Sequence, residues 1–241
     1  METLEEKTVA EYVADNIKTA HVFKKFGIDF CCGGKITLQK ACEKFGADYN
    51  AVISELEQIE NSGKPVYNYN SWEPDFLADH IVHIHHRYVD DNIPILLSYA
   101  EKVNRVHGHH NTELQQIEKL VQEVCDELAT HMKKEEIILF PYIKKLVATK
   151  RDNLPFNPPP FGTVDNPVRM MEDEHETAGT ILKEIARLSN GYTPPEYACN
   201  TYRAFYEKID EFEQDLHLHI HLENNILFPK AKLLEKSLTD K

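Results

Sequence analysis

The stretch HMKKEEIILFP, from His131 to Pro141, recurs as HIHLENNILFP from His219 to Pro229. Both copies read His-x-x-x-Glu-x-x-Ile-Leu-Phe-Pro, and they lie 88 residues apart. A single His-x-x-x-Glu often arises by chance. Two copies with the same matched letters in the same spacing instead indicate an internal repeat of a helical hairpin.

The spacing of histidine and glutamate within each copy suits metal binding. Residues four apart in a helix lie on one face, one turn apart, so an imidazole and a carboxylate can reach one cluster together. The imidazole can bind one metal ion, whereas the two carboxylate oxygens can bridge two. Two such helices would supply two imidazoles and two bridging carboxylates, the kind of site that helix bundles build around two iron ions.

The repeat also predicts ligands on the other two long helices. His175 is the candidate in the third helix, and moving back by the repeat length leads to about position 87, where His86 is nearest. His85 and His83 are close competitors, and spacing alone does not exclude His83 because it shares a helix face with His86. We therefore expect six ligands: His86, His131, Glu135, His175, His219 and Glu223.

The types of ligand indicate the metal. Mixed imidazole and carboxylate ligands suit a pair of iron or manganese ions, whereas zinc prefers four-coordinate sites that often contain thiolates. We expect two non-haem iron ions, bridged by carboxylates and by an oxo or hydroxo group. Six protein ligands leave coordination positions open, which a small diatomic molecule such as NO or O2 could occupy.

Composition limits the classes of function. The 241 residues carry a net charge of −13, and the basic face that nucleic acid requires is not visible. No apolar run approaches the roughly 20 residues that span a bilayer, and the first residues lack an apolar signal region. We therefore expect a cytoplasmic protein with no membrane and no nucleic-acid partner. Five cysteines, an odd number, argue against a disulfide framework.

Helix-forming residues dominate and glycine is scarce, which predicts an all-α protein. Residues 1–62 are expected to form a small helical domain, and residues 63–73 a polar, turn-rich linker. Residues 74–241 predict four long amphipathic helices in an antiparallel bundle. The first of these helices should run from about 74 to 103, with a kink near Pro94.

The N-terminal part contains a second motif, DFCCGGK, from Asp29 to Lys35. We interpret its adjacent cysteines, Cys31 and Cys32, as part of an exposed turn. Thiol redox chemistry, transient iron handling or contact with a client protein are candidate roles for them. The other three cysteines fit helix interiors: Cys42, Cys125 and Cys199.

This motif resembles the signature of the ScdA-type N-terminal domain, and the rest of the chain resembles the hemerythrin-like domain. Together, over nearly the whole chain, they resemble the RIC (repair of iron centres) family, which includes the YtfE and ScdA proteins. The resemblance implies a cytoplasmic di-iron protein that helps to restore iron–sulfur clusters after nitrosative or oxidative stress.

The resemblance also bears on particular residues. It selects His86 over His83, because the family's first ligand lies eight residues before the proline that matches Pro94. Glu127 and Glu174 match acidic positions near the family's site, where they would support the ligands or form part of an iron path. The extra histidines depart from the family pattern, and we expect them at the surface: His83, His85, His217 and His221.

Three functions follow from these patterns. The first is a repair factor that supplies iron to iron–sulfur client proteins. We expect such a factor to act as a non-enzymatic iron donor rather than as an enzyme. The second is a module that binds or senses O2 or NO, and the third is an oxidoreductase that reduces NO at the di-iron centre. The cysteine motif favours the first, since a simple gas carrier does not need it. A homodimer through the N-terminal unit is compatible with the sequence, although no motif supports it.

Overall fold

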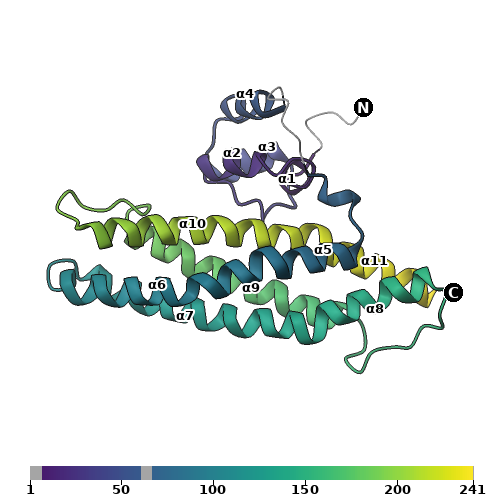
Figure 1. The fold of residues 1–241 in the computed structure, drawn as a ribbon. Coiled ribbons are helices and arrows are strands. Elements are labelled where there is room, and N and C mark those ends of the chain that lie inside the picture. The colour runs from purple at the N-terminus through teal and green to yellow at the C-terminus, as the bar shows by residue number, and fades with distance from the viewer. Residues whose placement is uncertain (1–6, 61–66, 241) are drawn as a thin grey trace. The chain divides into compact units, whose positions relative to one another are not determined.

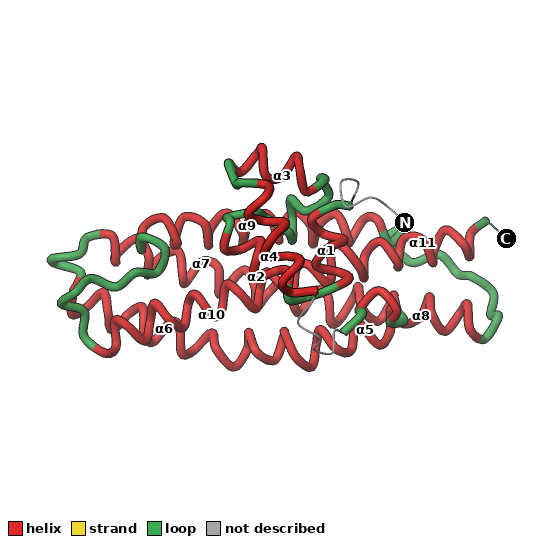
Figure 2. The backbone as a smooth tube through the Cα atoms, turned by 90° about the horizontal axis from the view of Figure 1, so that it is seen from above, coloured by secondary structure: helices red, strands yellow, loops and turns green. Residues whose placement is uncertain are grey.

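The computed structural model describes residues 7–60 and 67–240. Within these ranges the structure contains helices and a single isolated β-bridge, and no β-strand is formed. Figure 2 shows the helices joined by loops. The predicted all-α class is confirmed. The first residues of the predicted linker, 63–66, lie outside the described part of the chain.

One compact unit comprises residues 79–142 and 158–216. Its long helices run side by side in Figure 1, as predicted for a bundle, and α6 packs on α7 while α7 packs on α9. These helices are α6 (Arg87–His107), α7 (Glu113–Lys134), α9 (Asp165–Leu188) and most of α10 (Asn200–Leu222).

Helix α7 illustrates why these segments form a bundle. Its apolar residues recur every three or four positions and therefore form one stripe along the helix. Burial of each such side chain contributes roughly 1.5–3 kcal/mol, which stabilises the helix against its neighbours. The buried stripe consists of Leu114, Ile117, Val121, Val124 and Leu128.

A second unit comprises residues 143–157, residues 217–240 and the described residues up to Ala78. Helix α1 starts with a capping box between Thr8 and Glu11 and stops at Asn16, whose backbone is extended. Contacts join α1 to α2, α2 to α4 and α3 to α4. The remaining α-helices and the 3-10 turn η1 are α1 (Val9–Asp15), α2 (Thr19–Lys25), α3 (Leu38–Phe45), α4 (Tyr49–Glu60), η1 (Tyr69–Ser71), α5 (Pro74–Ile81), α8 (Phe140–Arg151) and α11 (Phe228–Thr239).

Three π-helical turns interrupt the long helices: η2 (Val82–His86), η3 (Glu135–Leu139) and η4 (Glu223–Leu227). In η3 the Phe140 N–H donates to the Glu135 carbonyl five residues earlier, and Phe228 and Glu223 do the same in η4. A proline follows each phenylalanine. Its ring would clash with the carbonyl four residues back in a regular helix, and the wider π turn provides space for it.

The π turns place the predicted ligands. Glu135 and Glu223 each begin a π turn, and His86 ends one. In the first long helix, Pro94 lies within α6 and a π turn precedes that helix, so the expected kink near Pro94 stays a prediction. Single π turns within α-helices are frequent at functional sites.

Candidate metal centre

The first copy of the repeat brings three predicted ligands together. His131 on α7, Glu135 in η3 and His175 on α9 are all buried. His131 Nε2 lies 3.4 Å from Glu135 Oε2 and 3.0 Å from His175 Nε2. His86 Nε2 lies 3.3 Å from the same Glu135 oxygen. The Glu135 carboxylate is therefore within reach of two imidazoles, as a bridging ligand would be.

The second copy has the same local geometry. His219, near the end of α10, and Glu223, at the start of η4, are both buried. His219 Nε2 lies 3.1 Å from Glu223 Oε1. The i, i+4 spacing thus produces the expected imidazole–carboxylate pair in both copies.

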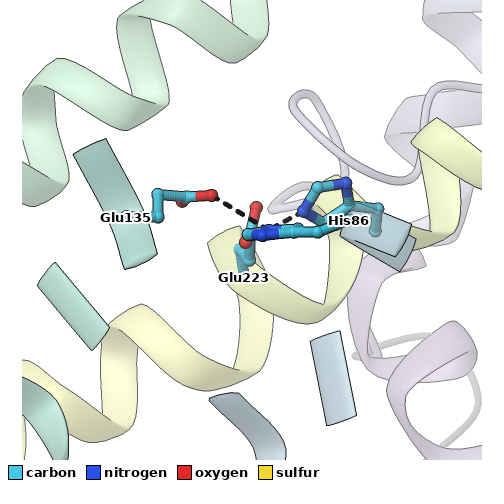
Figure 3. A group of neighbouring side chains, drawn as sticks. His86, Glu135 and Glu223 are labelled. Carbon is cyan, nitrogen blue, oxygen red and sulfur yellow. Dashed lines mark hydrogen bonds and ion pairs between the residues drawn. The ribbon is translucent and has the colours of Figure 1, made fainter. Parts of the chain in front are cut away.

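Two groups of four buried side chains place one potential ligand atom each within 4.8 Å of one another. Figure 3 shows His86, Glu135 and Glu223 from the first group pointing toward one another. The two glutamates belong to both groups. The groups are His86, Glu135, His219 and Glu223, and His131, Glu135, His175 and Glu223.

The chemistry of this donor set fits a pair of metal ions. The residues offer imidazole nitrogens and carboxylate oxygens and no thiolate, which suits iron or manganese better than zinc. Burial of two carboxylates in an apolar interior costs several kcal/mol per charge unless cations accompany them. Two divalent ions would supply that charge, and the shared glutamates could bridge them.

Further carboxylates are hydrogen-bonded to two of the predicted ligand histidines. Glu174 accepts a hydrogen bond at 2.8 Å from His131 Nδ1 and a second one from Lys134. Glu136 Oε1 lies 2.7 Å from His86 Nδ1. A hydrogen bond at Nδ1 fixes the tautomer and keeps Nε2 available for a metal.

A pocket of about 350 Å³ adjoins His131 and His175, and Glu127 and Glu174 are among its lining residues. Partial burial and the nearby carboxylates of Glu123 and Glu174 raise the pKa of Glu127. Burial also acts to raise the pKa of Glu174, but hydrogen bonds from Lys134 and His131 outweigh burial and lower it. The two acidic residues matched by resemblance thus line one opening onto the ligand histidines.

The extra histidines are only partly where the sequence predicted. His83 is exposed, as expected, and His217 is half-buried. His85 and His221 are buried, so the expectation of a surface position was wrong for both. His85 Nδ1 pairs with Asp215 at 3.0 Å, and His221 packs edge-on against the Phe30 ring. Burial lowers the pKa of His221 to about 4.

The Cys-Cys turn is built around Asp29. One carboxylate oxygen of Asp29 accepts hydrogen bonds from the N–H groups of Cys31, Cys32 and Gly33 at 3.1, 3.1 and 3.2 Å. Gly34 is required next, because a Cβ there would lie 2.3 Å from the Phe30 carbonyl oxygen. The sequence DFCCGG therefore specifies a tight turn.

This turn is less exposed than predicted. Cys31 is buried, with 6% of its surface accessible, and Cys32 is half-buried. The Asn225 amide covers the turn by donating to the carbonyls of Cys31 at 2.9 Å and Phe30 at 3.4 Å. The hydrogen bond with Cys32 and burial raise the pKa of Cys31 well above its usual value. The Cys31 thiol is consequently protonated at neutral pH.

Sequence reasoning missed the residues that support the site. Glu136 directly follows Glu135 and contacts His86, a predicted ligand from another helical segment. The local helical period does not reveal such a contact. Asn224 and Asn225 directly follow Glu223 and contact Cys32 and Cys31. The one available signal was the difference between the repeat copies, which have Glu136-Ile137 and Asn224-Asn225 at equivalent positions.

No helix in residues 7–60 or 67–240 is long and apolar enough to cross a membrane. Residues 77–231 match the hemerythrin HHE cation binding domain, and residues 5–60 match the ScdA_N domain, described as a domain of unknown function.

Curated relatives cover most of the chain. The iron–sulfur cluster repair protein YtfE of Yersinia pseudotuberculosis (serotype IB, strain PB1/+) is 38% identical over 213 residues, covering 87% of this chain and 89% of that protein. The protein of the same name from Yersinia pestis (strain Pestoides F) is 37% identical over 217 residues, covering 89% and 91%.

Proposed function

Since this chain belongs to the hemerythrin HHE cation-binding family and is similar to YtfE repair proteins along most of its length, we propose that it is a di-iron protein that repairs iron–sulfur clusters by supplying iron to client proteins. The observation that carries the proposal is the pair of glutamates, Glu135 and Glu223, shared by both four-residue groups. When bound, the two irons would supply Lewis acidity and one-electron chemistry at this centre.

Shared carboxylates make the stored iron releasable as a pair. If each glutamate binds both ions, a shift or protonation of one carboxylate weakens both sites at once. The ligands His86 and His131 are held in position by Glu136 and Glu174, so the site keeps its shape as iron leaves. The protein is thereby suited to cargo that is loaded and released in pairs.

The pocket beside His131 and His175 supports a route for the cargo. Glu127 and Glu174 give this opening negative charge, which attracts a divalent cation. Lys134 is hydrogen-bonded to Glu174 in the same pocket. Movement of this lysine would free a carboxylate for a departing ferrous ion.

We assign the thiol contribution to Cys32 rather than Cys31. Thiolate, not thiol, is the nucleophile and the metal ligand. The raised pKa and burial of Cys31 hold it in the protonated form, whereas Cys32 is only half-buried. Cys32 would receive iron in transit or contact the client.

The test is direct transfer. Protein loaded with ferrous iron is mixed under reducing, anaerobic conditions with the apo form of a four-iron, four-sulfur dehydratase and sulfide, and recovery of dehydratase activity is followed. We expect recovery in proportion to the iron lost from this protein. Cys32→Ser should slow transfer without reducing the iron content, and Cys42→Ser, at a buried position in α3, provides the matched control.

Other outcomes would identify the rival functions. Iron that stays bound while the apo-dehydratase remains inactive would overturn donation. Reversible NO or O2 adducts under those conditions would then indicate a gas-binding module. Nitrous oxide formed with an electron donor over many turnovers would indicate an NO reductase.

A further inference from the structure

Cys199 lies where the sequence did not predict it. The expectation of a helix interior was wrong, because Cys199 directly precedes α10 and is exposed. Its carbonyl accepts a 3.1 Å hydrogen bond from the Arg203 N–H, so it occupies the capping position at the start of a 23-residue helix. Nothing in the metal centre or in the Cys-Cys turn uses this thiol.

A histidine from another helix faces this thiol. His107, the last residue of α6, places its Nε2 3.2 Å from Cys199 Sγ. The His107 ring also packs against the Tyr202 ring, with centroids 5.3 Å apart, which fixes its orientation. With the ring proton on Nδ1, the imidazole accepts a hydrogen bond from the thiol.

The ends of the two helices favour proton transfer within this pair. Negative charge is stabilised near a helix N-terminus and positive charge near a helix C-terminus. Cys199 lies at the N-terminus of α10, and His107 lies at the C-terminus of α6. Transfer of the proton from sulfur to imidazole therefore leaves each charge at the helix end that stabilises it.

From this geometry we propose that Cys199 and His107 form a reactive thiol pair that exchanges with small disulfides, so that the protein carries a modification site separate from Cys31 and Cys32. The substrate class is a low-molecular-weight disulfide, such as glutathione disulfide, since an exposed thiol at a helix end can be reached by a small flexible molecule. The product is a mixed disulfide on Cys199.

The exchange balances without a further reactant. The Cys199 sulfur attacks one sulfur of the disulfide, a new S–S bond forms, and the original S–S bond breaks. The Cys199 sulfur is oxidised, and the departing sulfur is reduced to a thiolate. His107 takes the proton from Cys199 and passes it to the departing thiolate, which leaves as a thiol.

The test measures the rate of mixed-disulfide formation at each cysteine in the full-length protein. Wild-type protein is incubated with glutathione disulfide at neutral pH, quenched at intervals and analysed by peptide mass spectrometry. We expect Cys199 to react at least about tenfold faster in the folded protein than in the same chain unfolded in urea, because only folding places His107 beside the thiol to take its proton. His107→Gln should remove most of that acceleration.

His109→Gln is the matched control, since His109 is an exposed histidine in the loop after α6. It should react at the wild-type rate. Circular dichroism melting and iron content confirm that both variants keep the fold. The proposal is overturned if His107→Gln reacts as fast as wild type, or if folding does not accelerate Cys199.

Discussion

The two copies of the repeat share a backbone but differ in what they hold. In both, a histidine and a glutamate four residues apart lie within 3.4 Å, a π turn follows, and a proline comes after it. The copies differ in the three residues between the histidine and the glutamate and in the two residues that follow the glutamate. Glu136 and Ile137 occupy these positions in the first copy, and Asn224 and Asn225 occupy them in the second.

The residues at the two positions after each glutamate make different contacts in the two copies. Glu136 in the first copy contacts the predicted ligand His86, and Ile137 is 73% exposed. In the second copy the two asparagines contact the Cys-Cys turn instead, with Asn225 donating to Cys31 and Asn224 lying against Cys32. The repeated element therefore holds a predicted ligand histidine in one copy and the Cys-Cys turn in the other.

The largest expected effect concerns the part that the copies share. Glu135→Gln and Glu223→Gln should each abolish binding of both irons, because each carboxylate belongs to both four-residue groups. The loss of affinity should exceed the roughly 10–100-fold typical of changes beside a ligand. Iron analysis and the optical spectrum measure it, with the exposed Glu176→Gln as control. Loss of only half the iron in either variant would contradict the prediction that each glutamate is needed for both irons.

An intermediate effect is expected for the carboxylates that orient the histidines. Glu174→Gln and Glu136→Gln should each weaken iron binding roughly 10–100-fold, since His131 and His86 lose the partners that fix their rings. Titration against a competing chelator measures this. Glu174→Gln should have the larger effect because Lys134 also loses its partner. Unchanged affinity in both would show that the rings are held by packing alone.

The smallest effect concerns a position at which the two copies differ. Asn225→Ala should lower the free energy of unfolding by about 1–2 kcal/mol, through loss of its hydrogen bonds to the Cys-Cys turn. The equivalent change in the first copy, Ile137→Ala, should stay within about 0.5 kcal/mol because this side chain is exposed. Urea unfolding measures both. Asn225→Ala should also speed alkylation of Cys31, and equal alkylation rates would contradict a covering role for Asn225.

Much of the fold and the candidate site was predictable because it depends on local spacing. The i, i+4 pairs His131–Glu135 and His219–Glu223 are set by helix geometry, and the apolar periodicity of each long segment predicts a bundle. His175 was the candidate on the third long helix, and moving back from it by the repeat length led to a histidine near position 87. Spacing left His83 and His86 unresolved, whereas the structure exposes His83 and buries His86 beside Glu135.

The remaining features depended on contacts between segments far apart in the chain. Neighbouring residues alone set the repeated His–Glu pairs, the proline that follows each phenylalanine and the tight turn at DFCCGG. Packing between distant segments, in contrast, buries Cys31, places His221 on Phe30 and brings His107 to face Cys199. A helical period specifies which face of a helix is apolar, but it does not specify which distant side chain will cover that face.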